Sequence, residues 1–179
     1  GLGWTLALPA ITRKTDKGLP RYEDALESDE FVLSGAEDLV PVLVFENGRW
    51  ARETLPTRTL GGRTYRVQRY RPRIEGLFAQ IERWTNDSDR ADCFWRSISS
   101  DNITTWYGRT GESRIADPSA PERIFSWLVC ESSDGKGNAI AYGYQAEDST
   151  AVVLAQAHEA NRTVLGRSAN RYPKRIRYG

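Results

Sequence analysis

Residues 92–144 contain the stretch of sequence that decides the fold. They read DCFWRSISSDNITTWYGRT over 92–110, RIADP over 114–118 and RIFSWLVCESSDGKGNAIAYGY over 123–144. Short runs of aromatic and β-branched residues alternate with groups of Gly, Asn, Asp, Ser and Pro, a pattern typical of strands joined by turns. The stretch therefore predicts a β-sheet, and it contains no recognisable catalytic constellation.

The same pattern continues on both sides of this stretch. Asn47 and Gly48 directly follow an apolar run and predict a tight hairpin that returns at Trp50 and Ala51, because both turn residues tolerate positive φ. We predict strands over residues 4–11, 31–34, 39–45, 64–74, 77–85, 94–98, 103–107, 124–131, 139–145 and 171–178.

Only a few segments have a sequence pattern that predicts a loop or a helix instead of a strand. Residues 54–62 and 108–123 predict loops, and residues 77–85 also fit a helical spacing. Residues 149–162 are the one good helix candidate, with a strand over 151–154 as the alternative. Together, these predicted segments indicate an all-β fold, made mainly of short antiparallel strands, with at most one or two short helices.

Length and charge set further limits. The 179 residues suffice for one domain with a core, and the net charge of +1 favours no class of partner. The chain has no Met and begins Gly-Leu-Gly-Trp, so we expect a fragment of a single β-rich domain, 1–179, from a longer protein.

Two segments are charged with one sign. Residues 22–38 contain acids and no base, and residues 161–179 contain bases and no acid. We expect these two segments to face each other or solvent.

The two cysteines, Cys93 and Cys130, are too few for a disulfide framework, and both lie in apolar runs. We expect buried thiols, with a single bridge between them as the alternative. No window of the sequence reaches the length of a membrane-spanning helix, and no secretory signal is recognisable.

Candidate catalytic and metal-binding residues are few. His158 is the one histidine, so any Ser-His or Cys-His nucleophile must use it, but no Cys or Asp stands at a supporting spacing. Asp87, Asp89 and Asp92 suggest a calcium loop only faintly, because the glycine and the bidentate glutamate of such a loop are missing. A surface histidine and a solvated acidic loop are therefore the preferred interpretations.

A carboxylate pair such as Asp101 with Glu112 is the remaining catalytic candidate. Nothing in the sequence supports it beyond the presence of two acids. We therefore predict that the chain is not an enzyme, and we assign no catalytic, cofactor-binding or metal-binding residue.

Arginine and aromatic residues raise two binding alternatives. Residues 63–73 read RTYRVQRYRPR, which could bind phosphates, but the arginines fall on both faces of the predicted strand, as in a thin shell wetted on both sides. The tryptophans lie mostly in strand runs, which favours the core over an exposed glycan-binding face; they are Trp4, Trp50, Trp84, Trp95, Trp106 and Trp127.

Four long stretches carry a resemblance to a known family. They are GLGWTLALPAITRKTDKGLPRY over 1–22, LSGAEDLVPVL over 33–43, YRPRIEGLFAQIERW over 70–84, and residues 92–144. Over most of its length the chain resembles the SpvB-type amino-terminal domain of the B subunits of bacterial insecticidal toxin complexes (Tc toxins). The same domain opens the Salmonella virulence plasmid protein B. Residues 137–144 and 170–179 also resemble the tyrosine-bearing strand pairs of RHS/YD-repeat proteins.

The resemblance implies a scaffold role. In the family, B and C subunits form a hollow shell of β-strands around the toxic part of C, and a propeller in B docks on the pore-forming A subunit. We therefore expect a non-catalytic domain with an RHS-like shell sheet that helps to build and close this shell. The expected direct partners are the remainder of the B subunit and the RHS-containing C subunit, with the A subunit reached through the B propeller.

The resemblance also implies what this chain lacks. The propeller and the self-cleaving protease site lie elsewhere in such proteins, and the Glu-x-Glu pair of ADP-ribosyltransferases does not occur in this sequence. We expect no nucleic-acid partner, no membrane span, no cofactor and no metal. The expected location is a secreted toxin complex, assembled in the bacterial cytoplasm and exported by an unknown route. The alternative is a secreted module that binds glycans or another surface through exposed aromatics.

Overall fold

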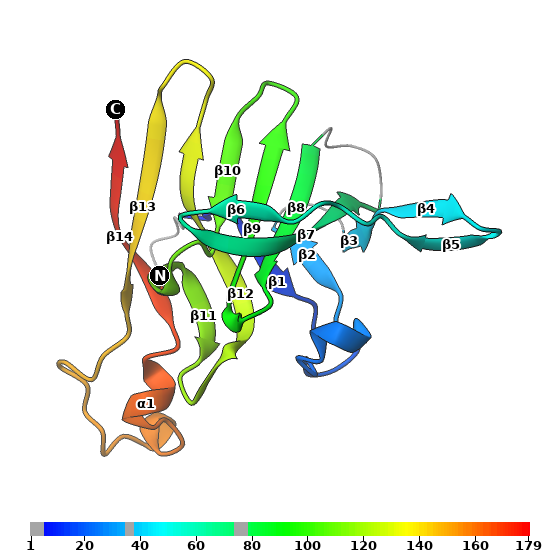
Figure 1. Cartoon of the computed structure of the whole chain (residues 1–179). Helices are drawn as coiled ribbons and strands as arrows, with labels where there is room; N and C mark the ends of the chain where they lie inside the picture. The colour runs from blue at the N-terminus through cyan, green and yellow to red at the C-terminus, as the bar shows by residue number, and fades with distance from the viewer. Residues whose placement is uncertain (1–5, 35–37, 74–78) are drawn as a thin grey trace.

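The structure, a computed structural model, describes residues 6–34, 38–73 and 79–179 (Figure 1). Almost all of its regular elements are strands, as the sequence predicts. The strands are β1 (Ala10–Arg13), β2 (Phe31–Leu33), β3 (Asp38–Pro41), β4 (Leu43–Glu46), β5 (Arg49–Arg52), β6 (Arg58–Leu60), β7 (Arg63–Pro72), β8 (Ala79–Asn86), β9 (Asp89–Ser99), β10 (Thr104–Tyr107), β11 (Arg114–Asp117), β12 (Ala120–Ser133), β13 (Ala139–Ala146) and β14 (Arg171–Tyr178). The helical elements are η1 (Asp24–Leu26), η2 (Gly111–Ser113), η3 (Ala157–Glu159) and the four-residue α1 (Val164–Arg167).

The main sheet closes on itself. Its strands follow the order β1-β2-β3-β7-β8-β9-β10-β12, and β1 pairs with β12 to complete the ring. In that closing pair, Ala10 lies opposite Leu128 and Thr12 opposite Ser126. Every pairing in the ring is antiparallel, so the fold is a closed, barrel-like sheet and the prediction of an all-β, mainly antiparallel fold is confirmed.

Alternation along the strands divides the apolar residues between two clusters. Ile81 on β8 and Trp95 on β9 lie inside the ring, in a core completed by Ile11, Phe31, Leu39, Tyr70, Cys93, Tyr107, Ile124, Trp127 and Val129. Their neighbours Trp84 and Phe94 point to the opposite face, where they pack with Tyr65 and Val67. The sheet is therefore apolar on both faces along β7 to β9.

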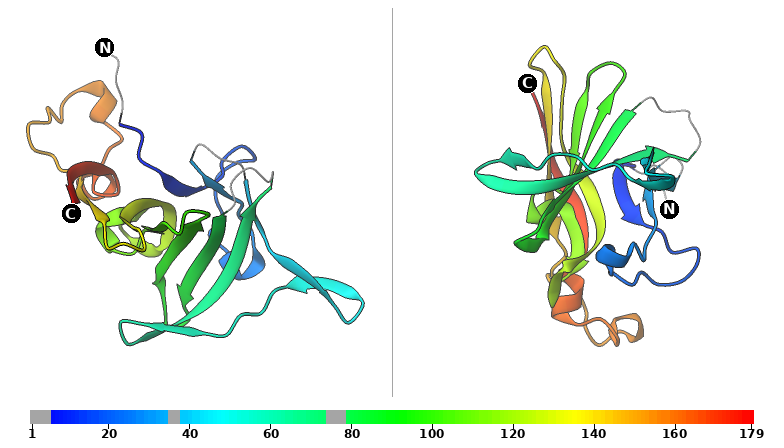
Figure 2. Two further views of the ribbon diagram at one scale, coloured as in Figure 1. Left: turned by 90° about the horizontal axis from the view of Figure 1, so that it is seen from above. Right: turned by 45° about the vertical axis from the view of Figure 1, so that its right-hand side comes forward.

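Two elements extend beyond the ring, as Figures 1 and 2 show. The β4–β5 hairpin forms a separate two-stranded sheet that projects from one side. It turns at Asn47 and Gly48, both with positive φ, as the sequence predicts. On the other side, β13 continues the sheet from the end of β12, and β14 pairs with β13.

Some sequence predictions were wrong in detail. The strand expected over 4–11 is β1, which begins at Ala10, and residues 1–5 lie outside the described part. The loops expected over 54–62 and 108–123 contain β6, β11 and the start of β12. Strands β6 and β11 are short, and each is fixed by pairing with a longer strand rather than by its own pattern.

The helix expected over 149–162 does not form, nor does the alternative strand over 151–154. Ala151 has a φ of 59°, which is incompatible with a helix, and Asp148 accepts a hydrogen bond from the Thr150 backbone N–H in a local turn. The α-helix lies further on, where the Thr163 side chain accepts from the Gly166 backbone N–H and caps it.

Gly108 permits the close packing of the core tryptophan Trp127. It has a φ of +67°, and a Cβ at this position would overlap with Trp127 Cδ1. Trp127 cannot move away, since it is fully buried and its Nε1 donates to the Cys93 backbone carbonyl at 2.8 Å. Glycine is therefore required here by both backbone conformation and space.

We expect Gly108→Ala to destabilise the protein by about 2–4 kcal/mol, from backbone strain and a clash in the core. The matched control is Gly135→Ala, because no atom lies within 4 Å of a Cβ built on Gly135. Urea unfolding followed by tryptophan fluorescence measures both. Equal stabilities of the two variants would contradict this account of Gly108.

Candidate functional site

The most strongly charged site lies at one mouth of the ring, where η1 and the loop after it meet β1. Arg13 is buried, and its Nη1 donates to Asp24 Oδ1 at 2.6 Å and to Asp29 Oδ2 at 2.7 Å. Its Nη2 donates to Asp24 Oδ2 at 3.0 Å, and its Nε donates to the Ile124 carbonyl at 2.7 Å. The guanidinium thus ties η1 to both β1 and β12.

A second buried cation shares the same carboxylate. Arg83 on β8 donates to Asp24 Oδ2 through Nη2 and to Cys93 Sγ through Nε. The Phe31 ring contacts both cations, with its centroid 5.2 Å from the Arg13 guanidinium carbon and 5.0 Å from that of Arg83. Charge pairing and cation–π contacts together make two buried arginines tolerable in an aromatic core.

The carboxylates of this site are ionised rather than reactive. Burial raises the pKa of Asp24, but the hydrogen bonds from Arg13 and the charge of Arg83 outweigh it and hold the pKa at about 2. Burial opposes the shift at Asp29 too, yet the backbone N–H groups of Arg21 and Tyr22 lower its pKa. Neither group can act as a general acid near neutral pH.

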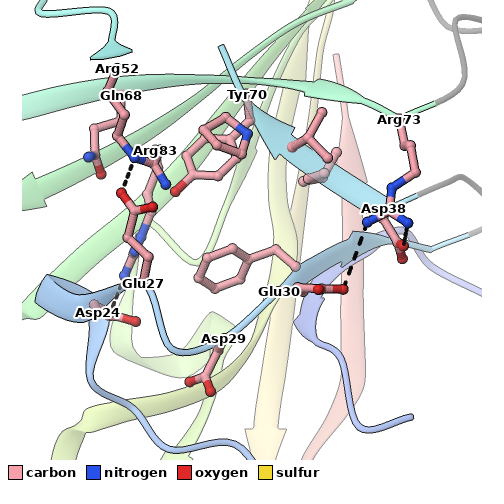
Figure 3. Close-up of a pocket in the computed structure, with 14 residues that line it drawn as sticks. Asp24, Glu27, Asp29, Glu30, Asp38, Arg52, Gln68, Tyr70, Arg73 and Arg83 are labelled. Atoms are coloured by element: carbon pink, nitrogen blue, oxygen red, sulfur yellow. Dashed lines mark hydrogen bonds and ion pairs between the residues drawn. The ribbon is translucent and has the colours of Figure 1, made fainter. Parts of the chain in front are cut away.

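A pocket of about 190 Å³ opens beside this network. Figure 3 shows Asp24 and Glu27 directed toward Arg83 and Arg52, while Arg73 meets Asp38 and Glu30 on the other side. The charged groups that line the pocket therefore face one another. These ion pairs hold η1 across the opening of the ring. None of the described residues that line the pocket forms an activated nucleophile.

Substitution of Asp24 tests how much these ion pairs stabilise the fold. We expect Asp24→Asn to cost about 2–3 kcal/mol at neutral pH, because Arg83 loses its carboxylate and Arg13 retains only Asp29. A depressed acid pKa stabilises the fold above the ordinary pKa of 3.8 and loses that effect as pH falls toward 2. The stability gap between wild type and variant should therefore narrow between about pH 5 and pH 2.

Urea titrations across that pH range measure the gap, and Asp101→Asn is the matched control because Asp101 is exposed in a turn. The control should track the wild type at each pH. A gap that stayed constant down to about pH 2 would show that Asp24 does not carry its charge into this network.

The second candidate site is the outer edge of β14. Among the described strands, β14 pairs with β13 and with no other, so its far edge is open. Residues 172–179 are all exposed, including the apolar side chains of Tyr172, Ile176 and Tyr178. Figure 1 shows β14 at the margin of the sheet, away from the ring. An open strand edge of this kind is a site for pairing with another strand.

The candidate catalytic residues are not brought together. His158 is exposed, and its Nε2 lies 3.5 Å from Glu159 Oε1, with no Ser or Cys in the contact. Asp101 and Glu112 lie beyond opposite ends of β10, in the turn before it and in η2 after it. Neither the histidine nor the carboxylate pair forms a catalytic arrangement.

The three aspartates of the faint calcium loop have separate partners. Asp87 pairs with Arg66, Asp89 accepts from the Ala91 backbone N–H, and Asp92 accepts from the Tyr65 hydroxyl at 2.8 Å. Asp92 is buried, so the expectation of a solvated loop was wrong for this residue. Within the described ranges, no group of three or more His, Cys, Asp or Glu side chains could hold a metal ion.

The arginine-rich strand β7 is not a basic surface. Three of its arginines, and Arg73 just after the strand, face carboxylates at 2.9–3.4 Å, in the pairs Arg63–Asp92, Arg66–Asp87, Arg69–Glu53 and Arg73–Asp38. The expectation of a strand polar on both faces was wrong, because Tyr65 and Val67 are buried on one face and Tyr70 on the other. These pairings leave little charge for a nucleic-acid backbone.

The tryptophans are mainly core residues. Trp84, Trp95 and Trp127 are buried, Trp106 is half-buried, and Trp4 lies outside the described residues. Trp50 is exposed at the β4–β5 hairpin, where it contacts Phe45 with the ring planes at 60°. Two rings at that angle do not form the flat platform that a sugar ring stacks on.

Both cysteines are free and buried, as expected, and the alternative disulfide does not form. Burial raises the pKa of Cys130, and its Sγ donates to the Trp106 carbonyl at 3.3 Å. A buried thiol with a raised pKa is a poor nucleophile.

The acidic and basic segments do not face each other. The acidic one pairs with Arg13, Lys14 and Arg83, and the basic one contributes Arg162 and Arg167 to Glu147 and Glu159. Arg13 and Arg83 are site residues that were not predicted from the sequence. The available signal was the position of Arg13 two residues after the buried Ile11, which places both on the same face of β1.

Comparisons with known proteins agree with this geometry. The sequence matches the family model described as Salmonella virulence plasmid 65kDa B protein (SpvB) over residues 1–179. The Mono(ADP-ribosyl)transferase SpvB of Salmonella typhimurium is 36% identical over 189 residues, which cover 100% of this chain and 29% of that protein. The SpvB protein of Salmonella dublin gives the same identity and coverage.

Solved structures share the fold. The N-terminal domain of effector protein SpvB from Salmonella typhimurium strain LT2 superposes with a TM-score of 0.77 at 35% identity, covering 99% of this chain and 53% of that one. The TcdB2-TccC3 structure gives a TM-score of 0.77 at 30% identity, covering 99% of this chain and 8% of that one. The Photorhabdus luminescens Tc holotoxin pore gives the same score and identity. In the described residues, no helix is both long and apolar enough to cross a membrane.

Proposed function

The chain belongs to the SpvB family, and from that premise we propose that it is a non-catalytic structural domain of a bacterial toxin complex. In this role it helps to build and close the hollow shell that encloses a toxic effector. Its relatives include proteins named as Tc toxin components, whose chains are more than ten times its length by the 8% coverage. A small domain with a closed sheet, within a long chain, fits a scaffold role.

The open edge of β14 is the observation that carries the proposal. The ring leaves no free edge among its own described strands, whereas the sheet continues outward through β13 and ends at β14. Proteins normally cover or shorten exposed strand edges, because such edges pair with other chains. An eight-residue edge strand with exposed aromatic residues is suited to continue into a neighbouring sheet.

A non-catalytic role is supported by the sites themselves. The strongest charged cluster is internally neutralised, and its carboxylate Asp24 has a pKa of about 2. The relatives named as mono(ADP-ribosyl)transferases are matched over 29% of their length, so their activity does not pass to this chain by similarity. We propose that catalysis in such proteins resides outside the matched part.

The proposal extends to partners and location. The direct partners are the remainder of a toxin B subunit and an RHS-containing C subunit, and the A subunit is reached through the B subunit propeller. The complex is secreted after assembly in the bacterial cytoplasm. These assignments rest on the family and on the likeness to the TcdB2-TccC3 and holotoxin structures.

The rival proposal is a secreted glycan-binding module, and the exposed pair Phe45 and Trp50 is the feature that would serve it. The two rings meet edge to face at 5.3 Å instead of lying in one plane. The other described tryptophans are buried or half-buried. The geometry therefore favours the scaffold.

Co-elution tests the scaffold role. The chain is mixed with the separately produced remainder of its parent B subunit and C subunit, and size-exclusion chromatography is run. We expect the chain to join the large species and to protect the enclosed part of C from added protease. Ile176→Pro should weaken this association at least about tenfold, because it removes an N–H that faces the open edge of β14.

Ile176→Val is the matched control, since it keeps the N–H and the strand preference. Pro173 already occupies the same strand, so a proline at an outward-facing N–H is compatible with the β13–β14 pair. A chain that stayed a well-dispersed monomer without affinity for B or C would overturn the proposed function.

A further inference from the structure

The end of β14, residues 175–178, presents two faces of opposite chemical character. Ile176 and Tyr178 are exposed on one face, and Arg175 and Arg177 are exposed on the other. Tyr172 lies beyond the register shift at Gly143 and Tyr144, opposite Gln145. Side chains alternate along a strand, so the two sets cannot mix. A strand added at this edge would therefore place alternate side chains beside the apolar face and beside the basic face.

The register defines which backbone groups the edge offers. Gly179 and Ala139 exchange both backbone hydrogen bonds, at 2.9 and 3.1 Å. Bonded pairs alternate along an antiparallel ladder, so Arg177 and Arg175 also bond to β13, opposite Ala141 and Gly143. The backbone groups of Ile176 and Tyr178 therefore point away from β13, to the open side. An added strand would bond to these two residues.

The apolar face continues into a groove. Ile103, Ile140 and Tyr178 line a depression of about 520 Å³ at the end of the sheet. Ile140 lies directly opposite Tyr178, and Tyr142 lies opposite Ile176, so these side chains share one face. Apolar side chains of an added strand would extend this surface and bury part of Tyr178, which is 84% exposed.

The basic face lacks carboxylate partners in the described part of the chain. The acids nearest in sequence have other partners. Glu147 pairs with Arg162 and Arg167, Glu159 pairs with Arg167, and Asp148 accepts a hydrogen bond from the Thr150 backbone N–H. Arg175 and Arg177 stand opposite the small residues Gly143 and Ala141, which leave both guanidinium groups uncovered. Residues opposite them on an added strand form non-hydrogen-bonded pairs, in which side chains lie closest.

From this complementarity, and resting on the proposed function, we propose that the edge of β14 receives an extended protein segment in which apolar and acidic residues alternate. The apolar residues face Ile176 and Tyr178, and the acidic residues face Arg175 and Arg177. The arginines thus select the partner strand, and they exclude strands that are basic or polar on that face.

The same charges disfavour two other occupants. A second copy of β14 would bring Arg175 and Arg177 against Lys174 and the arginines of the other copy, and like charges directly opposite each other are destabilising. A nucleic acid would use the arginines but leave Ile176 and Tyr178 uncovered, and the neighbouring basic residues Arg162 and Arg167 are already paired.

The test uses the 179-residue chain and short end-blocked peptides. One peptide alternates valine with glutamate, and a second alternates valine with lysine. Fluorescence anisotropy of labelled peptides gives the affinities. We expect the glutamate peptide to bind at least about tenfold more tightly than the lysine peptide, and Arg175→Glu combined with Arg177→Glu to reverse that order.

Two controls make the result specific to strand addition. A glutamate peptide N-methylated at alternate residues lacks the required N–H donors and should lose binding. Both arginines are exposed, so the double variant should keep the wild-type circular dichroism spectrum. Equal affinity for the two charged peptides, undiminished binding of the methylated peptide, or tighter binding of a single-stranded oligonucleotide would each overturn the inference.

The outcomes also separate this inference from the proposed function. Selective peptide binding without co-elution with B and C would uphold the acidic strand site and reject the shell role. Co-elution that is unchanged by the double charge reversal would uphold the shell role and reject the site.

Discussion

Asp24 neutralises two guanidinium groups that the closed sheet buries, and the mouth of the ring depends on this one carboxylate. Arg13 comes from β1 and Arg83 from β8, which are not neighbours in the ring. An unpaired buried arginine costs several kcal/mol, roughly the stability of a small domain. The pairing of β1 with β12, the position of η1 and the contact of Phe31 with both arginines are therefore mutually dependent.

This closure has a consequence for function. Because the ring closes, the strands of the main sheet that pair on one side only lie outside the ring: among the described strands these are β6, β11 and β14, and β14 ends the extension through β13. The outward sheet is thin and exposed, with Arg175 and Arg177 on one face and Ile176 and Tyr178 on the other. The ring is joined to this sheet through β12, and the outer edge of β14 is the edge that we propose binds a partner strand. That division fits a domain whose role is to connect parts of a larger assembly.

The sequence pattern predicted the positions of most strands. It did not predict that β1 pairs with β12 and closes the sheet into a ring. Alternation and turn residues locate β9, β10, β12 and β13, and Asn47-Gly48 locates the β4–β5 turn. Closure depends on pairing between Thr12 and Ser126, which local patterns cannot reveal over such a separation. The acidic segment was expected to face the basic segment or solvent, because charged residues usually lie on the surface, whereas Asp24 and Asp29 bind a buried arginine. The helix expected over 149–162 does not form, since the positive φ of Ala151 interrupts it.

Amide hydrogen exchange along β14 tests the central claim most directly. In the isolated chain, the account predicts slow exchange at Arg175 and Arg177, whose N–H groups bond to β13, and fast exchange at Ile176 and Tyr178. On assembly with the B and C subunits, the amides of Ile176 and Tyr178 should become slow while those of the arginines stay unchanged. Protection of all four amides in the isolated chain, or no change at Ile176 and Tyr178 on assembly, would contradict it.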